Sequence, residues 1–256
     1  MSAIYLEIKD SVGYITLSNP GKKNAMNHQS WLSLRKLARE VSEDPQVRCV
    51  VIQGEGSDFC SGADLSDAES LTLNGLARMR TIGETILSIQ RIHKPTIAKV
   101  AGVSVGAGMG IALACDLVVA SQDARFSQIF AKRGLAVDGG SSWLIPRLVG
   151  LQKAKELAFF GEIIGAGDAF RIGLVNRVLA NEELDGFVEG WARKLATGPT
   201  LALSLSKTLI NNAFATSFEQ ALEDEARSQA LVFTTEDCAE AIGAFLSRRE
   251  PIFKGK

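Results

Sequence analysis

Residues 106–110 (GAGMG) form a glycine-rich run whose backbone N–H groups are suited to bind negative charge. The stretch Thr96–Ala101 reads as a buried strand, followed by a glycine-rich turn, a short apolar helix and a second strand at Asp116–Ala120. N–H groups at a helix start lack intrahelical partners, and the helix dipole adds to their attraction for anions. Close packing of a helix on a strand selects the same small residues, so the run leaves both interpretations open.

One acidic residue, Asp138, is flanked in sequence by apolar residues and glycines. Residues 135–137 are Leu-Ala-Val, Gly139-Gly140 follow, and Trp143 comes shortly after. Partial burial among such neighbours raises the pKa of a carboxyl group toward the range useful for proton transfer. An aspartate before Gly-Gly-Ser-Ser is also suited to cap the helix that contains Trp143. From the residues alone, the cap is the simpler interpretation.

Several segments, taken in order, resemble the crotonase family, the enoyl-CoA hydratase/isomerase superfamily. They are residues 23–27 (KNAMN), 59–65 (FCSGADL), 94–95 (KP), 101–116, 124–127 (ARFS) and 134–150. The motifs follow the family's order and spacing, and the resemblance covers essentially the whole chain. It implies an α/β fold, a spiral of ββα units with a C-terminal helical segment.

The resemblance implies an oxyanion hole made by the backbone N–H groups of Ala63 and Ala107, which would hold the thioester carbonyl of an acyl-CoA. Enolising a thioester places negative charge on oxygen, and each fixed donor aimed there is worth about 3–4 kcal/mol. The residues implied to bind substrate are Lys23, Ala25, Asp64, Leu65, Gly106, Phe130, Trp143 and Lys254. Phe130 and Trp143, with Met79 and Leu76, fit an apolar acyl pocket or the core equally well. Since the CoA thioester is the substrate, no cofactor is expected.

The chain departs from the hydratase pattern at both catalytic glutamates. By motif alignment these positions hold Gly110 and Phe130, and no acid occurs between Asp123 and Asp138. Asp138 matches the acidic residue of isomerase-like members, although Val137 replaces their usual proline. With the resemblance, a catalytic Asp138 is favoured over the cap. Dehalogenase members pair this acid with a histidine that the expected helix at 67–91 lacks, which weakens that reading.

These departures favour an enoyl-CoA isomerase in which Asp138 shuttles a proton while the oxyanion hole holds the dienolate. One mobile acid suffices for such a shuttle. Two alternatives stay open. One is a hydratase-like enzyme that acts on an unusual acyl-CoA, and the other is a protein that binds acyl-CoA without turnover. The acyl group is not set by the sequence.

Composition places the chain among ordinary globular proteins. It has 256 residues, 46% hydrophobic and 22% charged, with a net charge of −1, so neither nucleic acid nor an anionic membrane is an expected partner. No signal peptide or membrane-spanning run is evident, and four cysteines without metal-like spacing suggest reduced thiols in the cytoplasm. Two histidines exclude a histidine-rich metal site, and no metal is expected.

The elements that must position these groups follow from hydrophobic periodicity. Alternation at 4–8 and 14–17 predicts a hairpin, and short apolar strands are expected at 48–53, 96–101 and 117–120. Helices are expected at 200–213, 217–233 and 235–248. Residues 1–198 then form the acyl-CoA-binding core, and 199–256 form a helical region that the resemblance implies covers the site and mediates trimers, or hexamers built as pairs of trimers.

Overall fold

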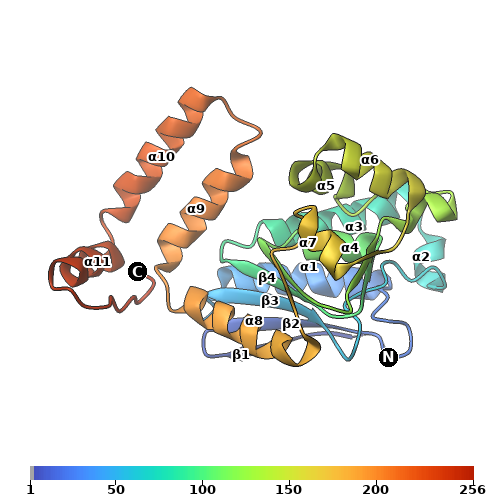
Figure 1. Ribbon diagram of the computed structural model, residues 1–256, viewed down its shortest axis with the longest axis horizontal. Coiled ribbons are helices and arrows are strands. Elements are labelled where there is room, and N and C mark those ends of the chain that lie inside the picture. Colours follow the sequence, from blue (N-terminus) through green and yellow to red (C-terminus); the bar gives the residue numbers. More distant parts are fainter. Residues whose placement is uncertain (1–2) are drawn as a thin grey trace.

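The central element is a six-stranded sheet whose strands follow one another in chain order, β1-β2-β3-β4-β6-β9 (Figure 1). A computed structural model describes residues 3–256, apart from the side chains of residues 70 and 71. The first two strands form an antiparallel hairpin, and each later strand adds in parallel. The strands are β1 (Ala3–Lys9), β2 (Val12–Ser18), β3 (Cys49–Gly54), β4 (Thr96–Val100), β6 (Leu117–Ser121) and β9 (Arg177–Leu179).

Helices cover both faces of this sheet, as expected for parallel strands. In β3, Val50 and Ile52 belong to the larger core with α1 (His28–Glu43) and α3 (Gly75–Gln90). The alternate residues Cys49 and Val51 belong to a second core under α8 (Asn181–Ala196). Successive strand residues point to opposite faces, so one apolar run serves two cores.

A small second sheet beside the first carries the glycine-rich segment. Its order is β5-β7-β8, from β5 (Val103–Val105), β7 (Arg125–Ser127) and β8 (Ile164–Gly165). The short α4 (Ala107–Leu113) follows β5 directly and is wholly buried. The surrounding elements are α2 (Ala68–Thr72), the 3₁₀ helix η1 (Ile129–Arg133), α5 (Ser141–Val149), α6 (Leu151–Phe160) and α7 (Ala166–Arg171).

Two basic side chains fasten loops to the core. The buried Lys94 Nζ donates to the carbonyl oxygens of Val41, Ser42 and Asp44, at 2.9, 2.7 and 2.8 Å, and so closes the end of α1. Arg48 donates from Nε to Thr200 Oγ1 at 2.8 Å and from Nη2 to the Gly198 carbonyl at 2.6 Å. Arg48 therefore holds the point where the C-terminal helices leave the core.

The last three helices form an arm that projects away from the sheets (Figure 1). They are α9 (Thr200–Asn212), α10 (Phe218–Val232) and α11 (Glu236–Leu246). Neither α9 nor α10 has a buried residue, and Phe214, Phe218 and Phe245 are exposed. Among the described helices, none combines the length and apolarity needed to cross a membrane.

The structure confirms the expected hairpin, the three short strands and the three C-terminal helices. The helix expected at 67–91 is wrong as a single element, because the chain forms α2 and then restarts as α3. Asn74 caps α3 by accepting a hydrogen bond from Ala77 N at 2.8 Å. An asparagine followed by glycine favours such a restart over a continuous helix.

Candidate active site

A cavity of about 760 Å³ lies where the loop after β3, the β5–α4 turn, α3 and the segment before α5 meet. Its lining is mainly apolar, with a few charged groups. Among the lining residues are Met26, Ala63, Asp64, Leu65, Arg78, Met79, Ile82, Gly106, Ala107, Phe130, Arg133 and Asp138. A large apolar cavity with a few convergent polar groups is the usual form of a small-molecule site.

Backbone pairing joins the two loops that carry Ala63 and Ala107. Cys60 N–H donates to the Val103 carbonyl at 2.8 Å, and Val105 N–H donates to the Cys60 carbonyl at 3.1 Å. A Cβ at Gly62 would lie 3.6 Å from Ala107 N, so the two loops are in contact beside the cavity. Their register is therefore fixed by main-chain hydrogen bonds.

The N–H groups of Ala63 and Ala107 are both available at this junction. Ala107 is the first residue of α4, where an N–H has no intrahelical acceptor. Around Ala63, the bridge to Met26 uses the Gly62 carbonyl and the Asp64 N–H, at 2.8 Å each. Within the described residues, neither Ala63 N–H nor Ala107 N–H donates to another backbone group. Both residues line the cavity.

Asp138 lies at the edge of the cavity, in a turn that packs against α4. Burial raises its pKa to about 6, and the positive charge of Arg78 partly opposes this rise. Its Oδ1 is buried and has no hydrogen-bond partner among the described residues. The carboxyl group is thus partly desolvated, and its buried oxygen is not used by the surrounding structure.

The structure does not support the alternative in which Asp138 caps α5. The N-cap residue of α5 is Gly140, and no side chain caps this helix. Asp138 contributes its backbone carbonyl instead, which accepts from Ser141 N–H at 3.0 Å. The turn is made by main-chain atoms, and Gly139 and Gly140 have φ values of 59° and 77° that favour glycine.

The two positions at which hydratases carry glutamates, 110 and 130, are both closely packed in this chain. Phe130 is 6% exposed, and its ring lines the cavity near Gly106, where a Cβ would be 3.6 Å from the ring. Gly110 is buried inside α4 and faces the turn that follows Asp138. An aromatic ring and a backbone turn occupy the two places.

Asp64, Leu65, Gly106 and Phe130 all line the cavity, as predicted for substrate contacts. Burial by itself would raise the pKa of Asp64, but hydrogen bonds from Lys22 and Ser66 hold it below the ordinary value. Lys22 Nζ lies 2.8 Å from Asp64 Oδ2. Asp64 therefore stays ionised and paired, in contrast to Asp138.

The remaining predicted contacts are not brought to the cavity within one chain. Neither Lys23, which is exposed, nor Ala25, which is buried, lines the cavity. Trp143 is stacked under Arg147, whose Cζ is 3.7 Å from the ring centroid. Lys254 lies in the tail next to Glu236, at 3.7 Å. No described residue of 199–256 lines the cavity, because the arm points away from it.

Arg78, the charged residue whose field reaches Asp138, belongs to no motif that marks it in the sequence. The signal was present, because Arg78 lies one helical turn before Ile82 in α3, and both line the cavity with Met79. A single arginine on an amphipathic helix usually belongs to its solvated face, so the pattern alone did not separate it. Arg78 lines the cavity because α3 and the β5–α4 turn border the same space.

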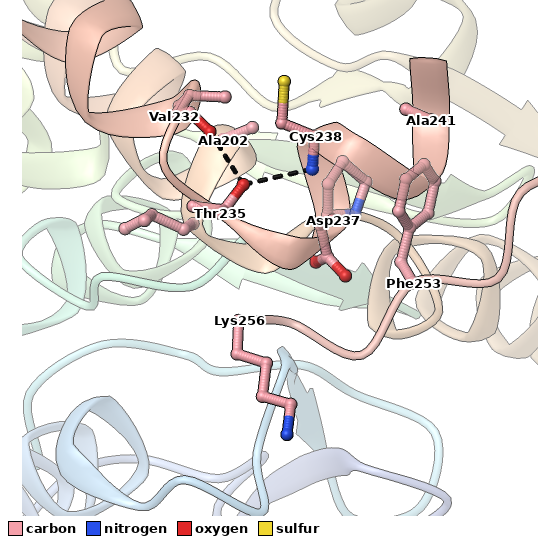
Figure 2. A pocket seen from close by; sticks show the side chains of 10 residues that line it. Ala202, Val232, Thr235, Asp237, Cys238, Ala241, Phe253 and Lys256 are labelled. Carbon is pink, nitrogen blue, oxygen red and sulfur yellow. Dashed lines mark hydrogen bonds between the residues drawn. The ribbon is translucent and has the colours of Figure 1, made fainter. Parts of the chain in front are cut away.

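A smaller pocket of about 160 Å³ lies in the C-terminal arm (Figure 2). Thr235 Oγ1 accepts from Cys238 N–H at 3.1 Å and donates to the Val232 carbonyl at 2.8 Å. The Asp237 carboxylate accepts from the N–H groups of Lys254 and Gly255. These polar groups form hydrogen bonds within the arm and so stabilise it.

Across the residues that the structure describes, no cluster of potential metal ligands was found.

Comparison with known proteins gives matches over the whole chain. The sequence model of the enoyl-CoA hydratase/isomerase family matches residues 7–256. The 1,2-epoxyphenylacetyl-CoA isomerase of Escherichia coli (strain K12) is 33% identical over 261 residues, covering 100% of both chains. The crotonyl-CoA hydratase of Syntrophomonas wolfei is 33% identical, over 99% of this chain and 98% of the relative. The crystal structure of an enoyl-CoA hydratase from Polaromonas sp. JS666 matches with a TM-score of 0.92 at 32% identity, covering 98% of this chain and 99% of that chain.

Proposed function

The chain belongs to the enoyl-CoA hydratase/isomerase family, and on this premise we propose that it is an acyl-CoA isomerase that moves a double bond through Asp138. Membership confirms the predicted resemblance and the crotonase-like fold. The relatives include both an isomerase and hydratases, so the choice between these reactions rests on the residues of this chain.

The observation that carries the proposal is a single desolvated acid beside two free N–H groups. The Asp138 carboxylate removes a proton from C2 of a 3-enoyl-CoA, and the electron pair moves into a dienolate. The negative charge on the thioester oxygen is held by the N–H groups of Ala63 and Ala107. Protonated Asp138 then returns the same proton to C4, which gives the 2-enoyl-CoA. No atom is gained or lost, and no water is needed.

Water addition is disfavoured by the groups that replace the two carboxylates. Hydration across the double bond requires an acid and a base that position one water molecule. A phenyl ring at Phe130 and a backbone turn beside Gly110 offer neither. The hydratases among the relatives make hydration the second candidate, and oxygen incorporation distinguishes it.

The test is incubation with 2-enoyl-CoA and 3-enoyl-CoA thioesters in ¹⁸O-water, with products identified by mass spectrometry. We expect isomerisation without incorporation of ¹⁸O, and a kcat that falls below about pH 6 as Asp138 becomes protonated. Asp138→Asn should lower kcat by about 10²–10⁴-fold. Oxygen incorporation, or unchanged turnover in Asp138→Asn, would show the proposal to be wrong. Binding without turnover of any thioester would favour the acyl-CoA-binding alternative.

We also propose that the arm binds further copies of this chain, as a trimer or a pair of trimers. Support comes from α9 and α10, which have no buried residue in a single chain, and from the exposed Phe214, Phe218 and Phe245. Large exposed apolar patches mark interaction sites. Sedimentation equilibrium should give three or six times the 27.4 kDa chain mass. A monomer at micromolar concentration would contradict this assembly.

A further inference from the structure

Gly110 lies in the middle of α4 with no room for any side chain. A Cβ built on Gly110 would lie 2.2 Å from the Gly139 carbonyl oxygen and 3.2 Å from Gly139 Cα. The first distance is far shorter than any van der Waals contact, and its partner is backbone rather than a flexible side chain. Even a methyl group at position 110 would force the turn after Asp138 to move.

The same turn touches α4 at a second point, one helical turn earlier. A Cβ on Gly139 would meet Ala107 Cα at 3.1 Å and Ala107 Cβ at 3.4 Å. Gly139 also has a φ of 59°, which favours glycine. The backbone that follows Asp138 is therefore pressed against the helix whose first N–H group faces the cavity.

We propose that Gly110 is a positioning residue, which lets the Gly139 carbonyl lie on α4 and so fixes Asp138 relative to the Ala107 N–H group. This inference rests on the proposed function, because it gives Asp138 and Ala107 the roles described there. An independent observation is the buried Asp138 Oδ1, which has no hydrogen-bond partner among the described residues, so no hydrogen bond to this atom positions it.

The arrangement also limits which side chains position 110 can hold. A glutamate at position 110 would begin with a Cβ in the space that the Gly139 carbonyl fills. In this conformation of the turn after Asp138, position 110 has no room for a carboxylate side chain. The absence of a carboxylate at 110 is thus part of how Asp138 is placed.

The test compares Gly110→Ala with a matched control, Gly83→Ala. Gly83 lies in the interior of α3, is exposed, and would place its Cβ within 4 Å of nothing. For Gly110→Ala, we expect kcat for isomerisation to fall by about 10²-fold with KM changed less than about threefold. The acidic limb of the kcat–pH profile should move from about pH 6 toward pH 4, because a displaced carboxyl group regains water. Gly83→Ala should retain the wild-type kcat and pH profile.

A loss of thermal stability with an unmoved pH profile would reduce Gly110 to a packing role and overturn the inference. Wild-type kcat in a folded Gly110→Ala protein would do the same. If Gly110→Ala does not fold, Gly139→Ala applies a milder overlap, against Ala107, and should show the same fall in kcat and the same shift of the acidic limb. Unchanged values in that variant would equally overturn the inference.

A second readout separates this inference from the proposed function. The stabilisation gained by Asp138→Asn at pH 8 measures the desolvation of this carboxyl group without any turnover. That gain should shrink at least twofold when Asp138→Asn is made in the Gly110→Ala background. A wild-type protein without isomerase activity refutes the proposed function, whereas an undiminished gain in the double variant refutes the positioning by Gly110.

Discussion

Replacement of Asp138 by asparagine should stabilise the protein at pH 8 while it abolishes proton transfer. The folded-state pKa of Asp138 is raised to about 6, above its ordinary value of 3.8. Between these values the unfolded chain is ionised while the folded protein keeps its proton. Stability from the protonated group is therefore fully present below pH 3.8 and is lost as the pH rises through about 6. Asparagine is neutral throughout and avoids this loss.

The size of the effect follows from the difference between the two pKa values. At about 1.36 kcal/mol per pKa unit, the difference corresponds to about 3 kcal/mol. Because the side chain keeps partial contact with solvent, we expect about half of this, ~1–2 kcal/mol. For a chain of this size, that increment raises the Tm by about 3–6 °C.

The assay is thermal unfolding of wild type and Asp138→Asn at fixed protein concentration, at several pH values from 4.5 to 8. The advantage of the variant should be largest at pH 8 and decline steadily below pH 6. Glu7→Gln is the control, since Glu7 is an exposed strand residue, and its Tm should follow wild type at each pH. A variant that is less stable than wild type, or an advantage independent of pH, would refute the reasoning.

Three further changes test other parts of the structure. Ala107→Pro removes an N–H group at the first position of α4, where proline is well tolerated, so kcat should fall by about 10²–10³-fold with little change in Tm; wild-type turnover would exclude this donor. Arg78→Gln removes a charge that lowers the pKa of Asp138, so the acidic limb of the kcat–pH profile should rise above pH 6; a downward shift would contradict this. Lys94→Met leaves three carbonyl groups at the end of α1 without their donor and should lower the free energy of unfolding by about 2–4 kcal/mol, measured by urea denaturation; a loss below 0.5 kcal/mol would be inconsistent with this role.

The sheet and the helical arm were predictable because their signals are local. Alternation in β1 and β2 and the serine cap of α10, where Ser217 accepts from Gln220 N–H at 3.2 Å, depend on neighbouring residues only. The restart at Asn74 was missed because the apolar spacing of α3 continues across a short break. The spiral itself came from resemblance, since strand periodicity does not determine how successive units stack.

The candidate site was predictable in part. Resemblance pointed to Ala63, Ala107 and Asp138, and the structure places all three at one cavity. The fit of Gly110 against Gly139 was not predictable, because it depends on two backbones that are distant in sequence. Trp143 does not line this cavity in the single chain, and its role in substrate binding stays a prediction. Its ring is partly exposed and contacts the Arg147 guanidinium, a side-chain contact that the motifs did not predict.

The chain-order arrangement of the main sheet has a consequence for synthesis on the ribosome. Each strand from β2 onward finds its pairing partner already made, so the sheet can grow in the direction in which the chain emerges. One face of the sheet stays exposed until α8 has been synthesised. This face carries Val12, Val51, Ile97 and Val119, which α8 covers in the folded protein. A nascent chain that has emerged through β9 but not through α8 therefore carries a finished sheet with one bare apolar face. Such an intermediate is a natural client for a chaperone during the interval before α8 emerges.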